Sequence, residues 1–521
     1  MSTPATIAAE RRVPRKAVVI AGIALLVLLM GGTLFLALHW PFTREKVIKS
    51  LEDSTASRVE IKTFHPFYFP RPGCAAEGVV FRKSSERGPV ALISVQKLTL
   101  ESGFLNMLRM HVSELRAEGA QVTISSGSKF EQKTDNGIVI DHFQADGAIV
   151  NFASRDGNEE PLKFVFEQFA LKNVSSSAPL SYQLKVKNPL PPGEIAAAGQ
   201  FGPLNLADSS KTAFSGDYTF SDADLGAFQG IAGKLFSRGK FHGTLGHIEI
   251  EGNTDAPAFE VTESHHAVHL ATQFQAYVNG ETGDTFFSSV QSRIGKTMVL
   301  WTGKVAGSEG KQGKVASLEM SSRNGRIEDL LRLFVTAEKP PMQGAISFKG
   351  TTLLPSGDLP FLKKVEINGA FGIDAGRFTN PETQHGVDQL SENSESDEVI
   401  KAEKKAAGGK EKEEDVPLAL SDVKGSVVVR NGTAKFSKLS FDIPGASAEM
   451  HGTYNLISQA IDLHGEIHMD SELSKTTHGV KALFLKPFDP FFKKKHGSLL
   501  PVKVGGTFKH PTFGLELAKK E

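Results

Sequence analysis

Apolar and polar residues alternate at every second position in two neighbouring stretches of this chain, and no other feature restricts its fold as strongly. The first stretch is "ASAEMHGTYNL" (446–456) and the second is "IDLHGEIHM" (461–469). A period of two is that of a β-strand with one face against an apolar interior and the other in water. Both stretches are therefore predicted to be antiparallel strands with one apolar face.

Short runs of the same character, bounded by turn residues, occur through most of the chain. They include 93–100, 121–125, 136–143, 181–187 and a closing pair of runs within 500–517. The 50 glycines and 25 prolines supply the turns. Because 521 residues are too many for one ordinary core, we expect several domains or an elongated repeat of mainly antiparallel β-structure.

The apolar face of these strands needs a cover. A second sheet usually provides one, which makes a sandwich. The alternative is an open apolar groove. The 36 phenylalanines do not decide between the two, because their apolar rings suit either interior.

The overall charge excludes one class of partner. The 59 basic residues balance the 59 acidic ones, and a neutral chain without a basic stripe is not expected to bind nucleic acid. The single cysteine, Cys74, excludes an intrachain disulfide framework. We expect a buried or loop thiol there.

Residues 17–38 form an uncharged apolar run that is long enough to cross a bilayer. A helix of these 22 residues would be about 33 Å long. Residues 1–16 contain four basic side chains close to this run, so the N-terminus is predicted to be cytoplasmic. A cleaved signal peptide is the alternative, but its apolar region would span only about 7–15 residues. We expect an uncleaved, single-pass anchor with residues 39–521 outside the cytoplasm.

Helical patterns are brief in the rest of the chain. Residues 43–57 place three apolar side chains on one stripe opposite charged ones, which predicts a short amphipathic helix. Residues 126–390 are expected to be a β-rich middle region with short helices near 222–236 and 326–334. Residues 391–415 contain no aromatic side chain and alternate blocks of both charge signs, so they are predicted to be a disordered insertion.

A search for catalytic or metal-binding motifs finds none that is complete. "IGKT" (294–297) imitates the end of a phosphate-binding loop, but Val290 stands where that motif needs a glycine. His265, His266 and His269 lie in an extended pattern and are expected to be strand histidines that face solvent rather than metal ligands. We therefore expect a protein that is not an enzyme and that binds neither a metal nor a cofactor.

Aromatic and basic residues are mixed in "KPFDPFFKKKHG" (486–497). Such clusters suit a membrane interface, and the alternative is an ordinary loop. The candidate membrane-docking tip consists of Phe491, Phe492, Lys493, Lys494 and Lys495.

The order of these elements resembles the AsmA-like family of bacterial envelope proteins, whose larger relatives include TamB. Within residues 39–125, "VEIKTFHPFYFPRPGCAAEGVVF" and "VQKLTLESGFLNMLRMHVSELRAEGAQVTI" resemble the family's N-terminal region. Within residues 416–521, "GSVVVRNGTAKFSKLSFDIPGASAEMHGTYNL" and the closing "GTFKHPTFGLEL" resemble its C-terminal domain. The motifs are short, and their order behind an anchor makes the resemblance specific.

The resemblance implies a fold and a function. The fold would be mainly β, with an N-terminal transmembrane helix followed by an elongated antiparallel β-sheet curled into a taco-like groove, and a few short helices. The protein would be anchored in the inner membrane with its bulk in the periplasm. It would bind or conduct phospholipids between inner and outer membrane and so support envelope integrity. The alternative is a non-enzymatic scaffold that contacts outer-membrane proteins during their targeting or assembly.

A groove of this kind would act by partitioning, because an acyl chain that enters water loses about 0.8 kcal/mol per CH₂. No single side chain is required for such a step. The apolar positions of the C-terminal alternation are the candidate groove lining, namely Val427, Val429, Met450, Tyr454, Leu456, Ile461, Leu463, Ile467, Met469, Phe513, Leu515 and Leu517.

Overall fold

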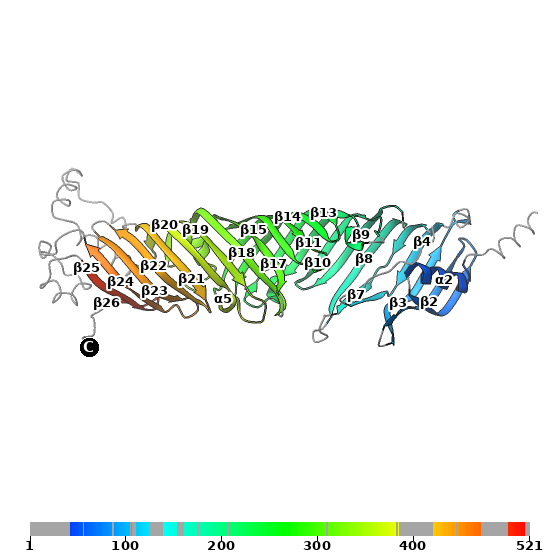
Figure 1. Ribbon diagram of the computed structural model, residues 1–521, viewed down its shortest axis with the longest axis horizontal. Coiled ribbons are helices and arrows are strands. Elements are labelled where there is room, and N and C mark those ends of the chain that lie inside the picture. Colours follow the sequence, from blue (N-terminus) through cyan, green and yellow to red (C-terminus); the bar gives the residue numbers. More distant parts are fainter. Residues whose placement is uncertain are drawn as a thin grey trace, which may run out of the picture. The chain divides into compact units, whose positions relative to one another are not determined.

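A computed structural model describes residues 42–515 except 56, 86–87, 105, 107–110, 126–138, 154–160, 176, 206–207, 281, 309–310, 382–383, 385–419, 444–445 and 470–498. The predicted anchor, the charged insertion, the membrane-docking tip and Leu517 lie outside the described residues. The fold is mainly β, a large antiparallel sheet with few helices (Figure 1). The chain divides into two compact units, Met1–Asp146 and Gly147–Glu521.

Among its described residues, the first unit contains the helix α2 and the strands β1 to β6. Their bounds are α2 Arg44–Thr55, β1 Arg58–Phe67, β2 Gly73–Ser85, β3 Gly88–Glu101, β4 His111–Glu118, β5 Gln121–Ser125 and β6 Val139–Gln144. β1, β2 and β3 pair in that order, β3 also pairs with β4 and β5, and β4 pairs in parallel with β6. α2 confirms the predicted amphipathic helix, because Val47 on its apolar stripe is buried in a cluster with Phe42 and Cys74.

The second unit is one long antiparallel meander. Its strands are β7 Ala148–Ala153, β8 Leu162–Val174, β9 Leu180–Pro189, β10 Pro192–Phe201, β11 Phe214–Asp224, β12 Ile231–Ala232, β13 Lys234–Thr244, β14 His247–Val261, β15 His266–Val278, β16 Thr285–Ile294, β17 Thr297–Ser308, β18 Lys311–Arg326, β19 Met342–Leu354, β20 Glu366–Phe378, β21 Ser421–Arg430, β22 Thr433–Ile443, β23 Ala446–Asn455, β24 Ile461–Met469, β25 Leu499–Gly506 and β26 Pro511–Leu515. Each pairs with the next along the chain, except that β11 pairs directly with β13 while β12 pairs with β14.

Short helical turns interrupt this meander among the described residues. They include η1 Ser209–Lys211, η2 Leu225–Ala227, α4 Ile327–Leu331 and α5 Phe361–Lys364. α4 lies where a short helix was predicted near 326–334. Near 222–236, where a second short helix was predicted, the helical part is the three-residue turn η2, because β11 ends at Asp224 and β12 and the beginning of β13 follow. Gly230 and Gly233 break the helical pattern there, because both adopt positive φ angles.

Of the two covers considered for the apolar strand faces, a sandwich is not found in the described part of the second unit. Its strands belong to a single sheet, and no second sheet covers their apolar side in the residues that the structure describes. The loops that contain α4 and α5 pack there instead, and Leu333 and Leu362 from these loops are buried against strand residues. Part of the cover therefore comes from segments between strands of the same sheet.

Loops from opposite ends of the strands meet in this unit. The loop after β18 and the turn after β23 lie at opposite ends, yet the Gln459 side-chain amide donates a hydrogen bond to the Thr336 hydroxyl. Likewise, the Asn380 amide donates to the carbonyl oxygen of Phe508 at 3.4 Å. These two contacts tie loop ends of the meander to each other across the sheet.

Candidate functional site

One side of the second unit's sheet is apolar from strand to strand, and we call it the apolar face. Strand register shows its continuity in the C-terminal strands. Val427 lies opposite Phe436, which lies opposite Gly452, and the same row continues through Leu463 and Val504. A neighbouring row runs Val429, Ala434, Tyr454 and Ile461.

The structure brings most of the predicted groove-lining residues onto this face, in two clusters. Val429 and Leu456 are buried in one cluster, with Val427 and Tyr454 packed against it. The other cluster contains Met450, with Leu463 and Ile467 packed against it. Ile461 occupies the row of Tyr454, while Met469, Phe513 and Leu515 occupy strand positions opposite Ala446, Val504 and Val502.

The other side of these strands is polar and exposed. On β24, the Asp462 carboxylate lies 3.0 Å from the Lys503 ammonium and 3.2 Å from Nε2 of His464. The hydrogen bond from Lys503 lowers the pKa of Asp462 below its ordinary value. The described residues contain no group of three or more His, Cys, Asp or Glu side chains that could hold a metal ion. Further along the chain, a hollow of about 680 Å³ lies over β11–β17, lined by polar side chains such as Arg238, Gln273 and Arg293.

The three histidines of the "ESHHAVHL" stretch are not equivalent. His269 is an exposed strand residue as predicted, and its Nε2 lies 2.6 Å from the Asp255 carboxylate. His265 belongs to the turn before β15, where its φ of 59° is left-handed, so its placement on a strand was wrong. His266 was wrongly expected to face solvent, since it is half-buried and its Nε2 lies 2.8 Å from the carbonyl oxygen of Ala337.

The apolar face carries a run of aromatic rings between β9 and β17 that no sequence motif marks as a site. We call it the aromatic stretch, and it consists of Tyr182, Phe214, Tyr218, Phe241, Phe274, Phe287 and Trp301. Ring centroids are 4.8 Å apart for Phe214 and Phe241, and 5.1 Å apart for Phe287 and Trp301. Single aromatic residues on many different strands give little local pattern, so only the register brings them together.

Glycines on neighbouring strands let two of these rings lie flat against the sheet. A Cβ atom on Gly216 would lie 2.4 Å from Oη of Tyr182. A Cβ atom on Gly239 would lie 2.9 Å from Cε1 of Tyr218, and one on Gly252 would lie 2.8 Å from Oη of the same ring. Because only glycine leaves this space, the rings cover bare backbone instead of standing away from it.

The hydroxyl and indole N–H groups of Tyr182, Tyr218 and Trp301 are each paired with an oxygen atom of a nearby serine. The Tyr182 hydroxyl donates to the carbonyl oxygen of Ser215 at 3.0 Å, and the Tyr218 hydroxyl lies 3.1 Å from the Ser237 hydroxyl. The Trp301 indole N–H donates to Oγ of Ser292 at 2.9 Å. Burial raises the pKa of Tyr182 to about 12, so this phenol stays neutral at physiological pH.

The loops around α4 and α5 fill the apolar face beside the aromatic stretch, and we call residues 327–337 together with 361–365 the plug. Leu362 is 0% exposed and Val335 is 1% exposed. One cluster joins Leu333 and Leu362 to Val268 and Val299 on one side and to Val429 and Leu456 on the other. Gly230 leaves room for α5, because a Cβ atom there would lie 2.3 Å from the backbone nitrogen of Phe361.

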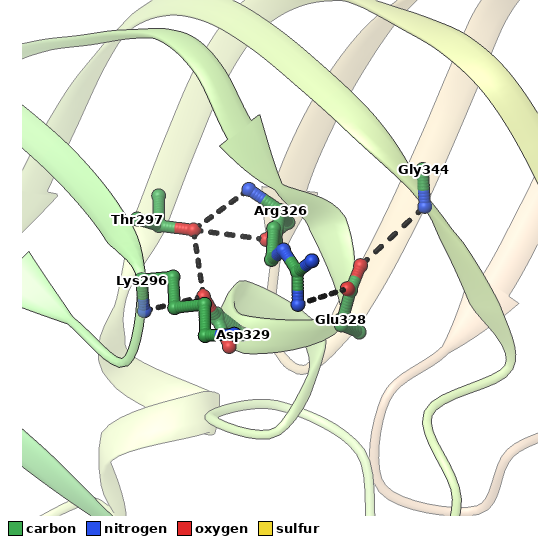
Figure 2. Close-up of polar contacts among 6 residues, drawn as sticks. All are labelled: Lys296, Thr297, Arg326, Glu328, Asp329 and Gly344. Atoms are coloured by element: carbon green, nitrogen blue, oxygen red, sulfur yellow. Dashed lines mark hydrogen bonds and ion pairs between the residues drawn. The ribbon is translucent and has the colours of Figure 1, made fainter.

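The "IGKT" sequence holds α4 in place through a set of hydrogen bonds (Figure 2). The Thr297 hydroxyl accepts a hydrogen bond from the backbone N–H of Arg326 at 2.8 Å and lies 3.0 Å from Oδ2 of Asp329. The backbone N–H of Lys296 donates to the same Asp329 oxygen at 2.8 Å. Gly344 N–H donates to Glu328 Oε2 at 3.4 Å. Two acidic residues at the start of α4 thus tie the plug to β17 and β19.

Comparisons with known proteins give no relative. No protein-family model, no curated protein and no solved structure matches this chain. In the part of the chain that the structure describes, no helix has both the length and the apolarity needed to cross a membrane.

Proposed function

We propose that this protein binds phospholipids by their acyl chains on the apolar face of its second unit and conducts them between membranes. The single observation that carries this proposal is the face itself. It runs from the aromatic stretch to β25 in one sheet, most of its large side chains are apolar, and the hydroxyl groups among them are mostly paired internally. Such a surface offers an occupant apolar contact and few hydrogen bonds, which is what a hydrocarbon chain requires.

A simple free-energy argument supports this function. Each CH₂ group that moves from water to an apolar surface gains about 0.8 kcal/mol. A face built of many similar apolar positions provides this stabilisation at each of them, so no unique side chain is needed. Headgroups would stay in water at the open side, beside the polar side chains at the strand ends.

The form of the groove belongs to the same proposal. We infer that the sheet curls around its apolar face in the taco-like manner expected for an AsmA-like protein. The hydrogen bonds from Gln459 to Thr336 and from Asn380 to Phe508 support this, since each joins loops at opposite ends of strands. The apolar run at 17–38 would anchor the protein in the inner membrane and leave its bulk in the periplasm.

Lipid extraction tests the function directly. The full chain would be purified, exchanged into a detergent without phosphate, and its bound phospholipids counted by mass spectrometry. Phe241→Ser changes the apolar face at a position in ring contact with Phe214 and should lower the number of phospholipids per chain. Lys240→Ser is the matched control on the opposite face, where the side chain is exposed.

The result that would refute the proposal is equal phospholipid content in the wild type and both variants, at the level found for any membrane protein with one anchor. Circular dichroism on each variant checks that the sheet is intact. If Phe241→Ser fails to fold, Phe274→Ser replaces it, because Phe274 is in ring contact with Phe287 on the same face, and it should lower the phospholipid content in the same way.

A further inference from the structure

The plug divides the apolar face into two parts. On one side lies the aromatic stretch of β9–β17, and on the other lies the cluster of Met450 and Val502 on β23 and β25. Between them, Leu333 and Leu362 are buried in a cluster that also contains residues of β14–β17 and of β21–β22. A hydrocarbon chain on the face cannot pass through side chains that are already in contact with both sides.

The aromatic stretch and the plug differ in how far their side chains are buried. Trp301, Phe241 and Phe274 are half-buried, whereas Leu362 in the plug is 0% exposed. Partial exposure of large rings leaves apolar area for an occupant to cover. The aromatic stretch therefore has exposed apolar area that a ligand could cover, whereas the side chain of Leu362 in the plug has none.

The chemistry of the aromatic stretch selects a hydrocarbon occupant over a peptide. Tyr218, Trp301 and Thr272 have their polar atoms paired with Ser237 and Ser292 on the same face. The strands beneath pair with a neighbour on each side, so they offer no backbone edge to an added strand. A peptide would leave its own N–H and C=O groups unpaired there, at a cost that hydrocarbon avoids.

We propose that the aromatic stretch is the acyl-chain binding site and that the plug closes it off from the C-terminal part of the apolar face. This rests on the proposed function, and it names where the lipid is held and where its path ends. The plug is fixed by the Thr297–Asp329 hydrogen bond and by the Gln459–Thr336 contact. Passage toward β26 then requires those contacts to open.

The chain carries its own reporter for this site. It has two tryptophans, Trp40 and Trp301, and Trp301 lies within the aromatic stretch. In a Trp40→Phe background, the full chain would be reconstituted in vesicles of phosphatidylethanolamine and phosphatidylglycerol whose acyl chains are brominated. Bromine quenches indole fluorescence on contact, so we expect Trp301 to lose most of its emission relative to vesicles without bromine.

Two further reporters, each in the Trp40→Phe/Trp301→Phe background, complete the experiment. Leu463→Trp places an indole beyond the plug, at the strand position opposite Gly452. Thr302→Trp places one on the exposed, polar side of β17. Both are expected to keep their emission, because the first is shut off by the plug and the second faces water.

The outcomes are distinct. Equal quenching of Trp301 and the Leu463→Trp reporter would show a continuous path and overturn the division, while the proposed function stands. Equal quenching of the Thr302→Trp reporter would mean that the sheet lies on the bilayer, which overturns the site.

Unquenched Trp301 in a chain that still yields extracted phospholipid overturns the site alone. Unquenched Trp301 with no extracted phospholipid overturns the proposed function as well.

Discussion

The side-chain amide of Gln459 donates a hydrogen bond to the hydroxyl of Thr336, which lies 123 residues earlier in the chain. Gln459 belongs to the turn between β23 and β24, and Thr336 belongs to the loop between β18 and β19. In an antiparallel meander these segments lie at opposite ends of their strands, so the contact shows that the two ends approach each other. It also holds the plug in place beside the apolar face.

The first prediction concerns the packing of the plug. Leu362 is 0% exposed, so Leu362→Ala should remove buried apolar volume and destabilise the fold by about 2–5 kcal/mol. Leu359 is 58% exposed in the same loop, and Leu359→Ala should change stability by less than about 0.5 kcal/mol. Urea unfolding followed by Trp301 fluorescence in the Trp40→Phe background measures both. Similar midpoints for the two variants would show that the plug is not a packed element.

The second prediction concerns the attachment of α4. Thr297 is 0% exposed, and its hydroxyl contacts Arg326 and Asp329. Thr297→Val keeps the shape of the side chain but leaves the Arg326 N–H unpaired, which should cost about 1–3 kcal/mol. Thr302→Val, at an exposed position of the same strand, is the control and should be nearly neutral. Urea unfolding midpoints measure both variants. An unchanged midpoint for Thr297→Val would show that its hydrogen bonds do not hold α4 in place.

A third prediction compares two buried tyrosines. The Tyr454 hydroxyl is buried with no hydrogen-bond partner among the described residues, and its burial raises its pKa to about 12. Tyr454→Phe should therefore leave stability unchanged or raise it by about 1 kcal/mol. Tyr182→Phe loses a real hydrogen bond to Ser215 and should lower stability by about 0.5–1.5 kcal/mol. Thermal melts should therefore show a lower melting temperature for Tyr182→Phe and not for Tyr454→Phe. Equal decreases in melting temperature would contradict the different hydrogen bonding of the two hydroxyl groups.

The fourth prediction concerns pH and the single thiol. Cys74 is 0% exposed, and desolvation raises its pKa from 9.0 to about 12. The folded thiol therefore holds its proton more tightly than the unfolded one. Its contribution to stability is full below pH 9 and is lost as the pH rises toward 12. Iodoacetamide at pH 8 should leave the native chain unmodified and should alkylate it fully in concentrated urea, and fast labelling of the native chain would contradict the burial.

Much of the fold follows from local pattern, and particular elements show why. The run 121–125 is β5, and the closing pair of runs is the β25–β26 hairpin with Val504 opposite Phe513. Alternation is enough for such strands because each buries one face. The amphipathic stripe of 43–57 was likewise sufficient to predict α2, because Val47 packs in a buried cluster within the same unit.

The rest depended on partners far away in the sequence. "DADLGAFQGIAGKLF" has helical spacing, yet Leu235 and Phe236 continue into β13, which pairs with β14. The aromatic stretch collects single rings from strands between β9 and β17, and the plug is buried by contacts across opposite strand ends. Register and sheet curvature decide these features, and a local pattern does not contain them.

The most direct test of lipid binding on the apolar face places a photoreactive benzoylphenylalanine on β15, at Phe274 on the apolar face or at Gln275 on the polar face. After irradiation in living cells, the protein is purified and the mass of any adduct is measured. We expect phospholipid adducts at position 274 and none at position 275. Lipid adducts at neither position, or cross-links to other proteins at 274, would contradict it and favour an assembly scaffold.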